Sequence, residues 1–165
     1  MYNEKDKEKR MEITVRELKL SFPEGFRVLS KEERAGMKMI KDGEGEVLSD
    51  PERHILVSIA YKKAGLFTGM VDTKDAVVSM EKQTASPMKD FGYVREGFET
   101  LDVGGKEADA FSYRYEAQGV AMSGESAILR HEKTFYYVHV YYRTALKEES
   151  SSLVKEVLSK AEWSK

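Results

Sequence analysis

The stretch from residue 98 to residue 143 constrains the fold most. It contains four segments rich in alternating apolar residues, and short turns such as Gly104-Gly105 separate them. Consecutive strands joined by short turns form an antiparallel meander. The last segment, at 135–142, is apolar on both of its faces, which indicates that both faces of the sheet are covered. The sequence therefore predicts an antiparallel sheet as the core.

The segments before the meander are shorter and less regular. Leu18, Leu20 and Phe22 share one face by alternation and predict a strand over 13–22. Ser30 and Glu33 have the spacing of a capping box that begins a short helix. Further strands are expected at 37–41 and 54–61, and loops at 42–52 and 64–72.

Two longer helices complete the pattern. The first begins at Asp72 or Thr73 and runs to about Ala85, since Pro87 is expected to end it. Its inner stripe is formed by Ala76, Val77, Met80 and Thr84. The second covers 145–163, with apolar residues at helical spacing at 146, 153, 154, 157, 158 and 161. We expect an α+β fold in which six to seven antiparallel strands lie between helices on both faces.

Short motifs resemble those of one known family. Residues 20–26, Leu-Ser-Phe-Pro-Glu-Gly-Phe, are similar to the opening of PsbP-like domains, where Phe26 stands in place of a common Trp. Residues 103–108, with Gly104-Gly105, resemble the glycine turn of that family. The resemblance spans 13–163 and implies an α/β/α sandwich. Members of that family share a fold and not a chemistry, and most of them bind other proteins. The resemblance therefore also implies a non-enzymatic binding protein. We expect one PsbP-like domain over 13–165 and a frayed segment over 1–12.

The composition of the chain argues against several classes of protein and of binding site. Lys and Arg number 27 and Asp and Glu 29, giving a net charge of -2 with both signs interspersed, so we expect no nucleic-acid partner. The chain has no cysteine, which excludes disulfides and thiolate metal sites. No apolar run has the length of a membrane span or a signal-peptide core. As the chain stands the location is expected to be cytoplasmic, or extracytoplasmic if an export signal was removed upstream of Met1.

The residues show no catalytic pattern. Gly104-Gly105 lies between two strands and not before a helix, so a hairpin turn is favoured over a phosphate loop. Residues 122–126 contain serines within a strand rather than in a nucleophile elbow. Glu96, Glu99 and Asp102 offer a carboxylate pair, which exposed strand positions explain equally well. We expect no catalytic residues, no cofactor and no enzymatic activity.

The histidines do not form a local metal site. His54, His131 and His139 have neither the i, i+4 nor the i, i+2 spacing that would place two of them on one face. A site would have to assemble from distant strands with carboxylates such as Glu132. The expectation is therefore that no metal is bound.

Tyr137, His139 and Tyr141 share one face of the last strand by alternation and are the candidate partner-binding residues. Each combines an apolar body with a polar tip, as residues at interfaces often do. The leading hypothesis is an accessory or chaperone-like protein that binds another protein, of unknown identity. A small-molecule or lipid-binding module with a pocket between sheet and helix is the alternative. A hydrolase or metal enzyme is the third, and converging carboxylates and a histidine would favour it.

Overall fold

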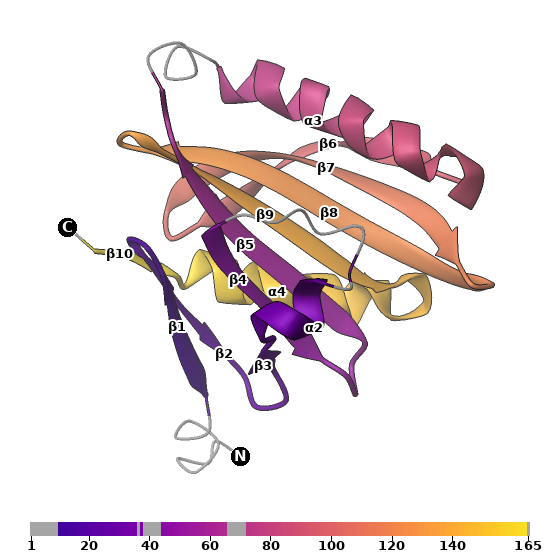
Figure 1. The fold of residues 1–165 in the computed structure, drawn as a ribbon, viewed down its shortest axis with the longest axis horizontal. Coiled ribbons are helices and arrows are strands. Elements are labelled where there is room, and N and C mark those ends of the chain that lie inside the picture. The colour runs from indigo at the N-terminus through magenta and orange to yellow at the C-terminus, as the bar shows by residue number, and fades with distance from the viewer. Residues whose placement is uncertain (1–9, 36, 38–43, 66–71, 165) are drawn as a thin grey trace.

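The computed structural model describes residues 10–35, 37, 44–65 and 72–164 (Figure 1). Over these residues, seven antiparallel strands form one sheet. In spatial order they are β3 (Arg27–Val28), β4 (Glu44–Asp50), β5 (Ile55–Lys63), β9 (Thr134–Arg143), β8 (Val120–His131), β7 (Lys106–Ala117) and β6 (Val94–Val103). The described helices are α2 (Lys31–Ala35), α3 (Thr73–Met88) and α4 (Lys147–Ser159). The predicted α+β fold with an antiparallel sheet is confirmed.

The predicted meander is the larger part of this sheet. β6 to β9 follow one another in space as they do in the chain, and β9 pairs on its other side with β5. Val138 consequently lies between Ile59 and Ala127 in the register of the three central strands. Side chains on both faces of β9 are buried, as its continuous apolar sequence predicts.

The prediction of one strand over 13–22 was wrong. The segment is a hairpin of β1 (Met11–Val15) and β2 (Leu18–Phe22). Arg16 in the connecting turn has a left-handed backbone, with φ of 56°. The apolar alternation changes phase between Val15 and Leu18, and this change marks the turn. Together with β10 (Glu162–Trp163), which pairs with β2, the hairpin forms a separate three-stranded sheet.

The predicted loop over 42–52 was also wrong. Residues Glu44–Asp50 form β4, which pairs with β5 along its whole length. Its acidic residues and glycine suggested a loop, but Val47 and Leu48 are buried on opposite faces, and this burial outweighs the local composition. The predicted strand at 37–41 lies outside the described residues except for Met37, which has no regular structure.

Both long helices differ at their ends from the prediction. Asp72 caps α3 as expected, and its side chain accepts a hydrogen bond from the Lys74 N–H. Pro87 does not end α3, because it lies in the last turn and Met88 is buried in the core beyond it. α4 ends at Ser159, and Trp163 belongs to strand β10 rather than to the helix.

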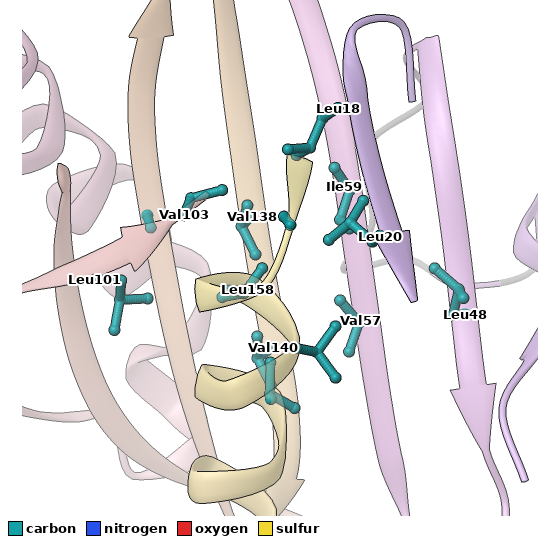
Figure 2. Packing of buried hydrophobic residues seen from close by; sticks show 14 of the residues in the cluster. Leu18, Leu20, Leu48, Val57, Ile59, Leu101, Val103, Val138, Val140 and Leu158 are labelled. Atoms are coloured by element: carbon teal, nitrogen blue, oxygen red, sulfur yellow. The ribbon is translucent and has the colours of Figure 1, made fainter. Parts of the chain in front are cut away.

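Two hydrophobic layers fill the space on either side of the large sheet (Figure 1). α4 and the three-stranded sheet cover one face, where the side chains are mainly aliphatic. Figure 2 shows Leu158 of α4 beside Val138 and Val140, and Leu20 of β2 near Ile59. α3 covers the other face over β7 and β8, where the core is mainly aromatic and includes Phe111, Tyr113, Tyr115, Phe135 and Tyr141.

Candidate functional site

Tyr137, His139 and Tyr141 lie on one face of β9, as the alternation predicts, and face the aromatic core. Their burial differs. Tyr141 is only 8% exposed and belongs to that core, whereas Tyr137 and His139 are half-buried. Burial raises the pKa of the Tyr137 and Tyr141 hydroxyls, so both are neutral donors at physiological pH. Only Tyr137 and His139 are accessible enough to contact a partner.

We use the name β5–β9 strip for four half-buried residues, Leu56 and Ala60 of β5 and Tyr137 and His139 of β9. The register places Ala60 beside Tyr137, with buried Ser58 beside His139. α3 packs over β7 and β8, so this part of the face lies beside the helix and not beneath it (Figure 1). The strip therefore combines an aliphatic border with polar tips in the middle of the sheet.

The orientation of His139 is set by its neighbour on β8. The Ser126 hydroxyl lies 2.7 Å from His139 Nδ1, and the two residues are directly opposite in the register. Ser126 is only 1% exposed, so its hydroxyl cannot meet a substrate from solvent. The pair resembles a catalytic dyad in composition alone, and its effect is to hold the imidazole in place.

Two turns meet at one end of the large sheet. They bring together Glu17 from the β1–β2 turn with His131 and Glu132 from the end of β8 and its following turn, and we call these residues the turn cluster. One potential ligand atom from each lies within 4.8 Å of the others. Glu17 Oε2 is 3.3 Å from His131 Nε2. Two carboxylates and a histidine thus lie close together, although no spacing in the sequence predicts that Glu17 approaches the other two residues.

Trp163 holds the turn cluster from the side. Its indole stacks on the His131 ring, with centroids 4.3 Å apart and 17° between the planes. The Trp163 indole N–H donates to the Val103 carbonyl at 3.1 Å. The Tyr136 hydroxyl accepts a hydrogen bond from the Glu17 N–H at 3.2 Å, which holds the β1–β2 turn.

Gly104 links the predicted glycine turn to this arrangement. The turn joins β6 to β7 as expected, and the Gly104 N–H donates to the Leu158 carbonyl at 2.9 Å. A Cβ at Gly104 would lie 2.6 Å from the Ala161 carbonyl oxygen, closer than real Cβ atoms approach. Because glycine has no Cβ, the segment after α4 can pass close to this turn and continue into β10 and Trp163.

A carboxyl pair lies under α4, but it is not the predicted one. Glu125 is 4% exposed, and it accepts hydrogen bonds from the hydroxyls of Tyr142 and Ser151 at 3.0 and 3.1 Å. Burial, followed by the charge of Glu125, raises the pKa of Glu99. Glu96 instead contacts Lys147 at 3.2 Å and Arg114 at 3.8 Å. The position of Glu99 beneath the helix therefore favours its protonated form more than solvent would.

A hollow of about 430 Å³ lies between the edge strand β6 and α4. It is where a pocket between sheet and helix was expected, but Asp102, Lys155, Glu156 and other polar residues line it. This lining does not suit a lipid, which needs a mainly apolar cavity. None of the helices in the described part of the chain is long and apolar enough to cross a bilayer.

The order and pairing of these elements match solved structures. A cyanobacterial PsbP from Synechocystis sp. PCC 6803 superimposes with a TM-score of 0.67 at 14% identity, covering 93% of this chain and 91% of that one. The chain has the PsbP-like fold. The Saccharomyces cerevisiae Ran-binding protein Mog1p gives a TM-score of 0.59 at 10% identity, with 93% and 95% covered. LpqN, involved in cell envelope biogenesis of Mycobacterium tuberculosis, gives 0.58 at 10% identity, with 94% and 91% covered.

Sequence comparison adds no closer relative. No protein-family model matches the chain, and no curated protein is significantly similar to it in sequence. The fold predicted from the motifs at residues 20–26 and 103–108 is thus supported by three-dimensional likeness alone. These three structures are described as a cyanobacterial PsbP, a protein involved in cell envelope biogenesis and a Ran-binding protein, so a shared fold serves different roles.

Proposed function

We propose that this protein is a non-enzymatic accessory protein that binds another protein through the β5–β9 strip. The observation that carries the proposal is the half-burial of Tyr137 and His139 in the middle of the sheet, between the buried residues Phe135 and Tyr141 on the same face of β9. Tyrosine and histidine at such positions lose little conformational entropy on binding and supply both apolar area and hydrogen bonds.

The rest of the strip supports a protein partner. Leu56 and Ala60 supply apolar surface beside the polar tips. Ser126 prepositions His139, so part of the ordering cost of association is met before binding. The likeness in fold to a Ran-binding protein is consistent with this class of function and says nothing about the identity of the partner.

The test is site-specific photocrosslinking in the native host. A photoreactive phenylalanine is placed at Tyr137, and in a control protein at Phe91, an aromatic residue that is 54% exposed and lies outside the strip. We expect one discrete adduct from position 137 and none of the same mass from position 91. His139→Ala should weaken the adduct while the thermal melt remains cooperative. Identical adducts at both positions, or no adduct at 137, would contradict the proposal.

A further inference from the structure

We propose that the turn cluster is a binding site for a divalent transition metal ion of the zinc class. The site joins Glu17 of the three-stranded sheet to His131 and Glu132 of the large sheet. The absence of a local ligand set led to the expectation that no metal is bound. In the folded chain, the turns bring together one imidazole and two carboxylates from segments that are distant in sequence. One possible ligand atom of each lies within 4.8 Å of the others.

The donor types match this ion class. Zinc binds imidazole nitrogen and carboxylate oxygen, whereas calcium and magnesium prefer oxygen ligands alone. Zinc–ligand distances of about 2.0–2.1 Å in a tetrahedral arrangement place two ligand atoms about 3.3 Å apart. The measured separation between Glu17 Oε2 and His131 Nε2 is 3.3 Å. The two atoms therefore already have the spacing that a shared ion requires.

One ligand atom in the turn cluster lacks an expected hydrogen-bond partner. Glu17 Oε2 is buried and has no hydrogen bond among the described residues. Buried polar atoms are nearly always hydrogen-bonded, because an unpaired one loses its hydration without compensation. If the proton is on Nδ1, the lone pair of Nε2 faces the carboxylate oxygen, and a cation between them would relieve the repulsion. A neutral imidazole is also the form that binds metals.

The ligands are held before any ion arrives. His131 is 9% exposed, and Trp163 stacks on its ring. Tyr136 holds the backbone of Glu17. Glu132 is exposed and follows directly after the histidine in a turn where its own φ is 56°. The third ligand is thus accessible from solvent, and three protein ligands leave a fourth position for water.

The experiment is zinc titration of the purified, chelator-stripped protein by calorimetry, followed by dialysis and elemental analysis. We expect about one equivalent of zinc, a higher thermal midpoint with zinc, and little response to calcium. Glu132→Gln replaces an exposed carboxylate by an amide of the same shape, so the variant should fold normally and bind zinc at least about tenfold more weakly. Glu17→Gln should do the same.

The matched control is His54→Ala, which removes an exposed histidine elsewhere and should leave the affinity unchanged. Replacing zinc by cobalt gives a second readout, because cobalt absorption in the visible range reports coordination directly. No zinc binding by the stripped protein would overturn the proposal and leave a simple contact between Glu17 and His131. Equal affinity in Glu17→Gln, Glu132→Gln and the unmodified protein would also overturn it, as would loss of binding in His54→Ala.

Discussion

The indole of Trp163 stacks on the imidazole of His131, with the ring centroids 4.3 Å apart. The same indole meets the edge of the Tyr136 ring at 5.0 Å and donates its N–H to the Val103 carbonyl. One side chain near the C-terminus therefore contacts three strands of the large sheet, β6, β8 and β9. It also belongs to β10, so it connects the large sheet to the small one.

Trp163→Ala should remove these contacts together. We expect a loss of about 3 kcal/mol in the free energy of unfolding, the lower end of the range for truncating a large aromatic residue, because Trp163 is half-buried. Urea denaturation at constant pH measures the effect. Phe91→Ala is the control and should change stability by no more than about 0.5 kcal/mol, since Phe91 is exposed. Equal effects would show that β10 is not held through Trp163.

Gly104 and Gly105 offer a direct comparison of two glycines in one turn. Both have a left-handed backbone, with φ of 58° and 86°, so alanine at either position costs roughly 1–2 kcal/mol. Only at Gly104 would the new Cβ also meet the Ala161 carbonyl, at 2.6 Å; at Gly105 it meets nothing within 4 Å. Gly104→Ala should therefore be clearly less stable than Gly105→Ala in thermal melts. Equal midpoints would mean that the segment after α4 can move away freely.

Glu99 should make stability depend on pH. Its pKa is raised above the usual 4.5 by burial and by Glu125, so above pH 4.5 the folded state holds more protons than the unfolded state. Stability then falls as pH rises through the folded pKa. Glu99→Gln resembles the protonated side chain, and it should raise the thermal midpoint at pH 7–8 but not at about pH 4. The exposed Glu116 supplies the control variant Glu116→Gln. A midpoint difference that is the same at both pH values would refute this account.

Substitutions at Tyr137 and Tyr141 should distinguish a role in partner binding from a role in the stability of the fold. If both tyrosines served only in partner binding, as their shared strand face suggests, replacing both by serine would abolish partner capture and leave the thermal melt mostly intact. Tyr141 is 8% exposed in the aromatic core, so Tyr141→Ser should cost about 3–5 kcal/mol. Half-buried Tyr137 should tolerate serine at a smaller cost. Chemical denaturation of the two single variants tests this, and a larger loss for Tyr137→Ser would place that residue in the core instead of the strip.

The α4 helix should be an integral part of the fold. Leu158 is 1% exposed and faces Val138 and Val140 (Figure 2). Leu158→Ala should therefore cost roughly 2–5 kcal/mol. Val94→Ala, at a position that is 48% exposed, should change little. An unchanged melt for Leu158→Ala would indicate that α4 detaches from the sheet.

The sequence by itself determined the elements whose signals are local. The meander formed where the sequence predicts it, because the alternation over the twelve residues of β7 and its flanking glycines are signals between neighbouring residues. The capping box also formed as predicted: the Glu33 N–H donates to Ser30 Oγ, and the Ser30 N–H donates to Glu33 Oε1, both at 3.1 Å. Tyr137, His139 and Tyr141 share a face for the same local reason.

The tertiary structure decided what depends on contacts between distant segments. β10 exists because Trp163 pairs with Leu18 and rests on His131, and no pattern within residues 145–163 distinguishes it from a continued helix. β4 forms because it pairs with β3 and β5 and buries its two apolar residues on opposite faces of the sheet, against its acidic composition. The turn cluster assembles from separate turns, and packing in the aromatic core buries Tyr141 while it leaves Tyr137 half-buried. The burial of a side chain and the approach of distant residues depend on tertiary packing, so the spacing of residues along the chain does not predict them.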